Sequence, residues 1–556
     1  MSLRPQSDLA VPDPTARVAR AAFPKPSRYM RMRDALGPLF HDDDFADLFP
    51  RRGRPVVAPW RLALVTVMQF AENLTDRQAA DAVRARLDWK YALSLDLEDP
   101  GFDYSVLSEF RSRLLDGGAE ERLLGRMLEL FGERGLVEGG GRQRTDATHV
   151  VGAVRDLNRL EIVGETLHAA LNVLAQVAPA WLSGRVDAGW FERYGERFSD
   201  YRLPKPHAER TELAELVGRD GAALLDAVYG PDAPGYLREV PAVDVLRRVW
   251  VQHFYVDHDG GASVNDGRVR WREQKSFPPS ALMVASPYDL DVRYSQKRGT
   301  EWRGFKVHLT ETCEPDRPHL ITHVATTAAT DQDVTALDAI HDGLDARGLL
   351  PAEHLADGAY LSAFELVKGR GRGVEMVGPM RVGTSWQAAD PDAFELARFD
   401  IDWEAEQVTC PEGERSYRWS PSRGPSGKPT LQVSFPKRAC SACEARPRCT
   451  KSASSPRTLT LHPRAEHEAL VAAREHQKTE AFRERYKARS GVEGTVSEAA
   501  FALGARRARY RGLAKTHLQL VATAAAMNLK RAVAWLDGVP RSGMRGSHFA
   551  RLAVAA

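Results

Sequence analysis

Residues 304–312 read GFKVHLTET, in which the apolar residues Phe305, Val307 and Leu309 occupy every second position. Successive side chains of a strand point to opposite faces, so this pattern predicts a strand with one apolar face. Residues 144–154 (RTDATHVVGAV) predict a strand before it. Residues 319–327 (HLITHVATT) predict another after the turn-forming Glu314-Pro315-Asp316. Three strands of this kind indicate a sheet at the centre of the chain.

A helix and a further strand follow. Thr330 and Asp333 have the spacing of a helix cap, and helical spacing then recurs at Val334, Leu337, Ile340 and Leu344. This helix should end near Gly348, and residues 353–360 (EHLADGAY) form the next expected strand. A helix that crosses between two strands of one sheet indicates an α/β fold with a right-handed connection.

The regions before the sheet differ in texture. Residues 1–27 are rich in Pro, Ala and Arg without periodicity, which predicts a flexible arm. Residues 28–142 are helical in pattern, with Pro59 at a helix start and a capping box at Thr75 and Gln78. We expect a helical, DNA-binding N-terminal domain resembling a helix-turn-helix, or else helices with solvated basic faces, and its expected exposed cations are Arg84, Arg86, Lys90, Arg111 and Arg113.

Two long segments interrupt the expected α/β region of residues 143–535. Residues 156–280 are mainly helical in pattern, and residues 373–464 hold a cluster of cysteines. Both are too long for plain loops, so we treat them as insertions. The apolar run 518–536 is broken by polar residues, which predicts a packed helix and no membrane span. Without an apolar secretory signal, a cytoplasmic, nucleoid-associated protein is expected.

Composition supports a multidomain globular chain: 556 residues, 43% hydrophobic and 27% charged. The net charge of +2 conceals an asymmetry, because residues 501–556 carry ten Lys and Arg against one acid, Asp537. Such an end, including a basic tail at 536–556, fits binding to DNA phosphates or a solvated tail. The cations nearest the expected site are Arg506, Arg507, Arg509, Arg511 and Lys515.

Three acids stand in positions suited to metal chemistry. Asp146 and Asp357 lie on expected strands of one sheet, and Glu493 lies on a helical pattern that begins near Glu466. Carboxylates that converge can hold two Mg²⁺ ions for phosphodiester chemistry. Because the chain contains 75 Asp and Glu, the three acids also have structural alternatives: a turn or strand-end aspartate for Asp146, a turn cap for Asp357 and a helix-surface charge for Glu493. The acids that compete with them for a metal-binding role are Asp289, Asp291 and Asp333. Tyr486 and Arg489 share a helix face with Glu493, although Gly491 and Gly494 weaken that helix.

Four of the five cysteines are clustered, at Cys410, Cys440, Cys443 and Cys449. Four thiolates suffice for a closed structural Zn²⁺ site, and free buried thiols are the alternative. The fifth, Cys313, is expected to be a small buried hydrophobe.

From about Arg28 to Leu536 the chain resembles the DDE transposases of bacterial insertion sequences. The resemblance rests on residues 59–93, which look like an InsH-type N-terminal domain, and on TDATHV, SPYDLDVRYSQKRGTEWRGFKVHLTET, HLADGAYLSA and YKARSGVEGTVSEAAFALGARRARYRGLAKTHLQ. It implies an RNase H-like mixed sheet flanked by helices, with an all-α N-terminal domain and two insertions.

The resemblance also implies roles for single residues. Asp146, Asp357 and Glu493 would be the catalytic triad that holds Mg²⁺ or Mn²⁺, with Asp146 shared by both ions. Tyr486 and Arg489 match a Tyr-x-x-Arg-x-x-x-Glu signature that contacts the DNA backbone. The basic residue of that signature falls on Ala500, which leaves open whether Arg506 or Lys515 acts as its substitute.

The expected function is that of a transposase. It would bind double-stranded DNA at the terminal inverted repeats, cleave a strand by metal-dependent hydrolysis and join the 3′ end to target DNA, as a homodimer in the DNA complex. The alternatives are a catalytically idle DNA-binding derivative and an RNase H-like nuclease without strand transfer.

Overall fold

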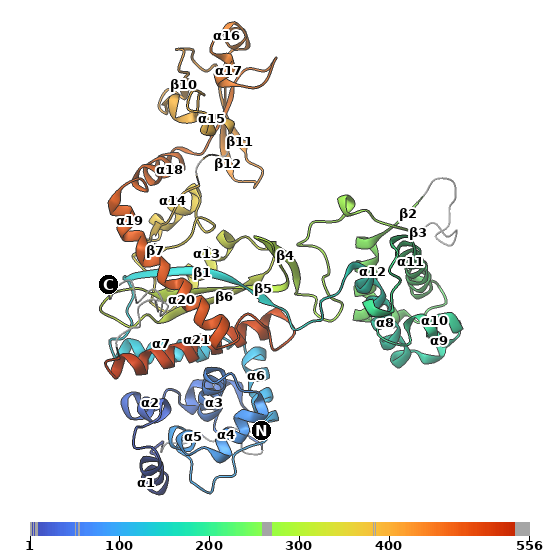
Figure 1. The fold of residues 1–556 in the computed structure, drawn as a ribbon, viewed down its shortest axis with the longest axis vertical. Coiled ribbons are helices and arrows are strands. Elements are labelled where there is room, and N and C mark those ends of the chain that lie inside the picture. Colours follow the sequence, from blue (N-terminus) through green and yellow to red (C-terminus); the bar gives the residue numbers. More distant parts are fainter. Residues whose placement is uncertain are drawn as a thin grey trace, which may run out of the picture.

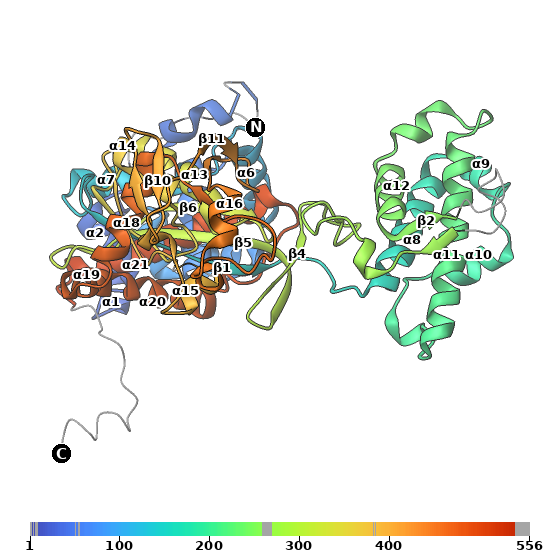
Figure 2. The same cartoon turned by 90° about the horizontal axis from the view of Figure 1, so that it is seen from above.

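The computed structural model of the chain describes residues 3, 5, 9–50, 52–53, 56–257, 269–381, 383 and 385–539. Its centre is a sheet that N-terminal and C-terminal helices cover, and two inserted modules project from it (Figure 1). In Figure 2 the helical insertion stands apart from the rest of the chain. Most of the basic tail, from residue 540 onward, lies outside the described residues.

The central sheet is mixed, and its members are β1 (Arg142–Val151), β4 (Arg293–Lys297), β5 (Thr300–Thr312), β6 (Ile321–Ala328), β7 (Glu353–Leu355) and β8 (Glu375–Val377). The strand order is β4-β5-β1-β7-β8, with β6 also paired to β5. β5 runs antiparallel to β1, β4 and β6, whereas β7 is parallel to β1 and to β8. This mixed order confirms the expected RNase H-like α/β fold.

The alternating apolar residues in 304–312 form one apolar face of β5, as predicted. Phe305, Val307 and Leu309 are buried in the largest core. The crossover helix is α13 (Leu337–Asp345), preceded by a short 3₁₀ turn at Asp333–Ala336. Gln332 occupies the N-cap position of that turn, so the cap expected at Thr330 was wrong. α14 (Ala363–Gly371) then leads from β7 to β8.

The N-terminal region contains α1 (Asp13–Ala22), α2 (Arg28–Leu36), η1 (Asp42–Leu48), α3 (Pro59–Ala71), α4 (Asp76–Ala85), α5 (Leu87–Ala92), α6 (Ser105–Asp116) and α7 (Arg122–Glu133). Pro59 begins α3, and Thr75 with Gln78 forms the predicted capping box. Residues 13–22 differ from the flexible arm expected there: α1 packs on α5, and the buried Thr15 hydroxyl donates to the Leu95 carbonyl at 2.8 Å. Packing across the chain orders a segment with little periodicity of its own.

α21 (Leu513–Leu536) joins the N-terminal helices to the sheet. It contacts β6 on one side and α2, α3 and α7 on the other, and Figure 1 shows it running between the two layers. The buried Asn528 amide accepts from the Ile321 N–H and donates to the Ile321 carbonyl, both at 2.7 Å. The apolar run 518–536 is therefore a packed helix, as predicted. No helix among the described residues is long and apolar enough to cross a membrane.

The first insertion has a separate hydrophobic core. Its elements are α8 (Arg159–Val177), α9 (Pro179–Ser183), α10 (Ala188–Tyr194), α11 (His207–Tyr229), α12 (Pro241–His253), β2 (Phe254–Val256) and β3 (Val269–Trp271). β2 and β3 pair with each other and not with the central sheet. The insertion is thus mainly helical, as the sequence pattern indicated.

The second insertion is smaller in extent than residues 373–464, because β8 at 375–377 belongs to the central sheet. The elements that follow are α15 (Trp386–Ala389), β9 (Asp400–Asp402), β10 (Gln407–Thr409), β11 (Arg418–Arg423), β12 (Pro429–Ser434), α16 (Lys437–Ala442), α17 (Arg446–Cys449) and β13 (Thr458–Leu461). They enclose a small core that includes Phe399, Val433 and Phe435. We call this unit the cysteine module.

The chain returns to the sheet through α18 (Arg464–His476), α19 (Glu480–Tyr486), the 3₁₀ turn η8 (Lys487–Ser490), α20 (Gly491–Ser497) and the π turn η9 (Glu498–Ala502). The long helical pattern from Glu466 to Glu493 is thus broken into several pieces. Thr479 caps α19 by accepting from the Phe482 N–H, and η8 changes the helix geometry just before Gly491.

Candidate active site

Asp146 and Asp357 come together through the parallel pairing of β1 with β7. In the register, Arg144 lies opposite Leu355, and each aspartate is two residues farther along its strand direction. Asp357 stands just past the end of β7, where its Oδ1 accepts from the Ala359 N–H at 2.8 Å. Because the strands run parallel in this register, the two aspartates lie close together, and the charge of Asp357 acts on Asp146.

Arg489 links this edge to Glu493. Its Nη2 atom lies 2.9 Å from Asp146 Oδ2, and its Nη1 atom lies 2.9 Å from Glu493 Oε1. The Glu493 side chain is 67% exposed, whereas that of Asp146 is 18% exposed. Asp146, Arg489 and Glu493 thus form one chain of ion pairs between β1 and α20.

The charges at this edge influence one another. Burial raises the pKa of Asp146; the positive charge of Arg489 opposes that effect and the negative charge of Asp357 adds to it. Although burial alone would lower the pKa of Arg489, the charges of Asp146, Asp357 and Glu493 raise it. The pKa of Asp146 is raised overall, so burial and the charge of Asp357 outweigh the stabilisation that Arg489 gives to its charged form.

Tyr486 lies beside the same acids. Its hydroxyl donates to the Ala356 carbonyl at 3.2 Å, one residue before Asp357, and its ring stacks on Phe482. Burial raises the pKa of Tyr486. All five residues that the sequence placed at the centre of the site, Asp146, Asp357, Tyr486, Arg489 and Glu493, are thus brought together.

Sequence reasoning missed two residues near the aspartates. Tyr360 is fully buried, its hydroxyl lies 2.6 Å from His308 Nδ1, and burial raises the pKa of Tyr360 with contributions from Asp333, Asp146 and Asp357. Lys297, at the end of β4, lowers the pKa of Asp146 by its charge. The signal for Tyr360 was its place three residues after Asp357, in the turn that ends the strand.

The donor set fits a hard divalent cation. Asp146 and Glu493 each direct an oxygen to a different nitrogen of one guanidinium, so both carboxylates already face a common positive charge. Such oxygen ligands are those that Mg²⁺ and Mn²⁺ prefer. As the side chains stand, no group of three or more His, Cys, Asp or Glu within the described ranges is arranged to hold a metal ion.

The competing acids have structural partners. Asp289 accepts from the Gly512 N–H at 2.8 Å and Asp291 from the Leu513 N–H at 2.9 Å, so both stabilise the start of α21. Asp333 pairs with Lys306 at 2.9 Å. These contacts account for Asp289, Asp291 and Asp333 without a catalytic role.

The cations that follow Glu493 lie on a loop, residues 503–512, and at the start of α21. Arg506 donates to the Thr148 hydroxyl at 3.2 Å. Its guanidinium therefore lies against β1, at a residue two positions after Asp146. Arg509 donates to the Leu74 carbonyl at 2.7 Å and lies over Phe70, so it ties the loop to the N-terminal helices. Arg507, Arg511 and Lys515 are exposed, and Ala500 is buried.

Two of the cations expected to be exposed on the N-terminal helices are buried. Lys90 is 3% exposed and donates to the Asp99 carbonyl at 2.7 Å. Arg111 is 6% exposed and pairs with Asp76 at 2.6 Å. The expectation of exposure was wrong for both, because a long cationic side chain can reach internal acceptors that sequence spacing does not reveal.

The four clustered cysteines line one cavity of about 520 Å³ in the cysteine module. Burial raises the pKa of Cys449, and the charges of Cys440, Cys410 and Cys443 add to that effect. The four thiols therefore lie near one another, although 29 or more residues separate Cys410 from the others in sequence. Cys313 is buried beside Leu355 and Phe482, as predicted, and burial raises its pKa to about 12.

Comparison with known proteins adds two family matches. Residues 409–533 match a family described as Transposase DDE domain, a stretch that contains Glu493 and all four clustered cysteines. Residues 17–113 match a family described as Transposase domain (DUF772), which spans most of the N-terminal helices. A search of curated proteins found no match. The two matches, on either side of a sheet of RNase H-like strand order, support a DDE transposase of insertion sequences.

Proposed function

We propose that this transposase binds the terminal inverted repeats of its insertion sequence, cleaves a DNA strand by hydrolysis and joins the freed 3′ end to target DNA. The observation that carries the proposal is the convergence of Asp146, Asp357 and Glu493 around Arg489. Three carboxylates, from β1, from the turn after β7 and from α20, lie beside exposed cations, which suits a reaction on phosphodiesters.

Asp146, Asp357 and Glu493 would hold Mg²⁺ or Mn²⁺, which supply Lewis acidity for activating the attacking oxygen and stabilising the leaving one. Arg489 is the counter-charge of Asp146 and Glu493 without DNA, and it would turn to a backbone phosphate when DNA arrives. Tyr486 would hold the adjoining backbone through its hydroxyl. Arg506, held on β1 beside Asp146, is a better substitute than Lys515 for the cation missing at Ala500.

We propose a separate role for each region of the chain. Residues 28–142 would bind DNA, residues 143–535 would form the catalytic domain with its two insertions, and residues 536–556 would add basic contacts. Because two ends of the element must meet before strand transfer, we propose a homodimer in the DNA complex. The nucleoid is the expected place of action.

The test is incubation of the full chain with a duplex that ends in the element's inverted repeat, a target plasmid and Mg²⁺. Repeat strands joined to the plasmid support a transposase. Hydrolysis without joining supports the nuclease alternative, and salt-sensitive binding without cleavage in Mg²⁺ or Mn²⁺ supports an idle derivative. Terminal inverted repeats bracketed by a short target duplication around the coding region would give independent support.

Replacing Arg507 and Arg511 together by alanine should weaken DNA binding at all sequences. Removing one cation that binds a phosphate should make the salt dependence of log Kd shallower by about one. The measurement is the Kd for repeat DNA across a series of salt concentrations. Arg247→Ala is the matched control, because Arg247 is 52% exposed on α12 and its replacement removes the same kind of charge elsewhere. An unchanged salt slope in the double variant would rule out this DNA-binding surface.

We propose structural Zn²⁺ in the cavity lined by Cys410, Cys440, Cys443 and Cys449. The purified protein should contain about one Zn²⁺ per chain, because four thiolates complete a tetrahedral shell. Replacing Cys440 and Cys443 together by serine should remove the metal and make the cysteine module sensitive to protease. Cys313→Ser is the control, and this variant should retain the Zn²⁺. The zinc site is contradicted if the purified protein contains no metal, all four thiols react rapidly with a thiol reagent, and the cysteine module is still resistant to protease.

A further inference from the structure

A buried ionic network lies on the face of β1 that carries Asp146. Arg144 precedes Asp146 by two residues, so the two side chains share a face of the strand. Arg144 lies opposite Glu311 of β5 in the register, and its Nη2 atom is 2.6 Å from Glu311 Oε1. Glu311 is fully buried, and Arg531 of α21 reaches its other oxygen at 2.7 Å.

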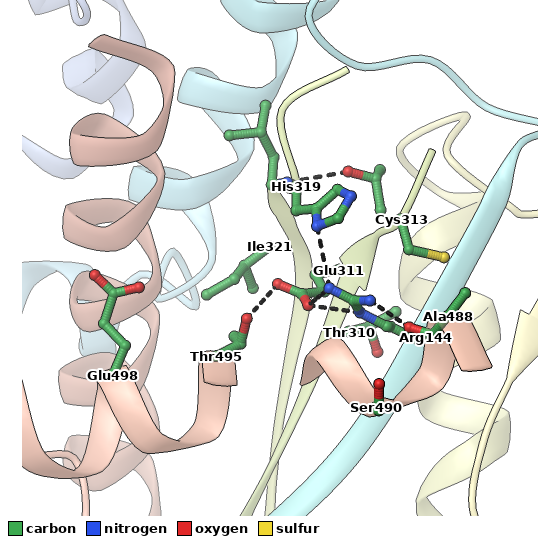
Figure 3. A network of polar contacts seen from close by, with 12 residues as sticks. Arg144, Thr310, Glu311, Cys313, His319, Ile321, Ala488, Ser490, Thr495 and Glu498 are labelled. Atoms are coloured by element: carbon green, nitrogen blue, oxygen red, sulfur yellow. Dashed lines mark hydrogen bonds and ion pairs between the residues drawn. The ribbon is translucent and has the colours of Figure 1, made fainter. Parts of the chain in front are cut away.

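This network holds both flanks of the segment that carries Arg489 and Glu493 (Figure 3). On one flank, Arg144 donates to the carbonyl of Ala488, the residue before Arg489. On the other, the Thr495 hydroxyl donates to Glu311 Oε2 at 2.6 Å, two residues after Glu493. One ion pair on the sheet thus anchors η8 and α20 on either side of the proposed metal ligand.

Gly491 belongs to the same arrangement. A Cβ atom at this position would overlap the Arg144 guanidinium, at 2.6 Å from its Cζ atom. At Gly494, in contrast, nothing lies within 4 Å of such an atom. A side chain at position 491 would therefore have to displace the Arg144 guanidinium, which is itself buried and paired with Glu311.

The buried charges are fully engaged. Burial alone would raise the pKa of Glu311, but Arg531 and Arg144 hold it below its ordinary value. Arg531 also reaches Thr495 at 2.8 Å and Glu498 at 3.1 Å. Because an unpaired buried charge is costly, the network has one favourable arrangement, with α20 seated against β1 and β5.

We propose that Arg144 and Glu311 are positioning residues, which set Glu493 and Arg489 at a fixed place relative to Asp146 so that the three acids close around the metal. The proposal rests on the proposed function, in which Glu493 is a metal ligand. Partners that orient metal ligands typically change metal affinity by about 10- to 100-fold when they are replaced. Replacing Arg144 or Glu311 should thus alter metal dependence more than DNA binding.

The test compares Glu311→Gln with the wild type in the complex with repeat DNA. Mn²⁺ binding is measured by electron paramagnetic resonance and the metal dependence of cleavage by titration. Glu311→Gln should raise the half-saturating Mn²⁺ concentration about 10-fold or more in both measurements, with cleavage recovering at saturating Mn²⁺. The Kd for repeat DNA should stay within about twofold, because Glu311 is fully buried and offers no surface to a phosphate.

Two further variants keep the inference testable. Gly491→Ala retains every charge of the network and should shift the Mn²⁺ requirement in the same direction, and it decides the matter if Glu311→Gln does not fold. Glu165→Gln is the matched control: this buried glutamate of α8 pairs with Arg155 at 3.3 Å in the helical insertion, outside the network, and its replacement should leave Mn²⁺ binding unchanged.

An unchanged Mn²⁺ affinity in folded Gly491→Ala and Glu311→Gln, with activity reduced only in proportion to unfolded protein, overturns the positioning role. Failure of the proposed function is distinguished by Glu493→Gln. If that variant binds Mn²⁺ as the wild type does, Glu493 is no ligand, whatever the Glu311 variant shows.

Discussion

Asp146→Asn should lower strand cleavage at repeat ends by about 1000-fold or more, because loss of a charged metal ligand removes several kcal/mol of transition-state stabilisation. The substitution preserves the shape of the side chain. It removes the negative charge of Asp146, which pairs with Arg489 and interacts with Asp357. Single-turnover cleavage of labelled repeat DNA in saturating Mg²⁺ is the measurement. Asp357→Asn should behave in the same way.

DNA binding separates this effect from unfolding. Asp146→Asn should bind repeat DNA within about threefold of the wild-type Kd, since the substitution removes no cation and lessens repulsion of phosphates. Asp289→Asn is the control acid: it bonds to the Gly512 N–H at the start of α21 and should keep cleavage near the wild-type rate. Wild-type cleavage by Asp146→Asn would falsify the triad.

Stability should fall steeply as the pH drops below about 6.5, because several histidines are buried in the neutral form. Burial lowers the pKa of His308 and of His323 to about 4, and that of His354 to about 3, from an ordinary value of 6.5. Between these values the unfolded chain binds more protons than the folded one. The free energy of unfolding therefore rises with pH in this window and falls on acidification.

The expected size is large relative to the stability of an ordinary domain. At about pH 5, each such histidine should cost roughly 2 kcal/mol, and the three together roughly 6 kcal/mol, against a typical total of about 5–15 kcal/mol. Urea unfolding of the full chain at neutral pH and at about pH 5, followed by circular dichroism, measures the difference.

A matched pair of variants assigns the effect. His308→Gln, within the sheet, should make the dependence of stability on pH shallower by nearly one proton. His207→Gln, on the exposed start of α11, should leave that dependence unchanged. Equal unfolding midpoints at the two pH values in the wild-type protein contradict the prediction.

Much of the architecture followed from local patterns. The alternation in GFKVHLTET predicted β5, the capping box at Thr75 predicted α4, and the apolar run 518–536 predicted a packed helix, because each pattern reports burial along one element. Errors arose where distant contacts overrode local pattern. α1 is ordered by α5, and β8 is a short strand that is recognisable only by its pairing with β7.

The candidate active-site residues could be nominated from sequence, since motif context placed Asp146 and Asp357 on expected strands and Glu493 near a helix. Their convergence could not be read from the chain. It depends on the register between β1 and β7 and on Arg489, whose partners Asp146 and Glu493 lie on different elements. Ion pairs that form across the fold leave no trace in sequence spacing.

Gly491 shows most clearly the difference between what the sequence determines and what only the tertiary structure determines. From sequence alone it is a residue that weakens a helix, and Arg144 is one cation among 77 Lys and Arg. Arg144 and Glu311 lie 167 residues apart, and only strand pairing sets them opposite each other, with the Gly491 backbone against the guanidinium. Sequence was sufficient for strands, helices and candidate acids, because these depend on neighbouring residues. The folded chain was needed to place Glu493, because that depends on charges brought together from β1, β5, α20 and α21.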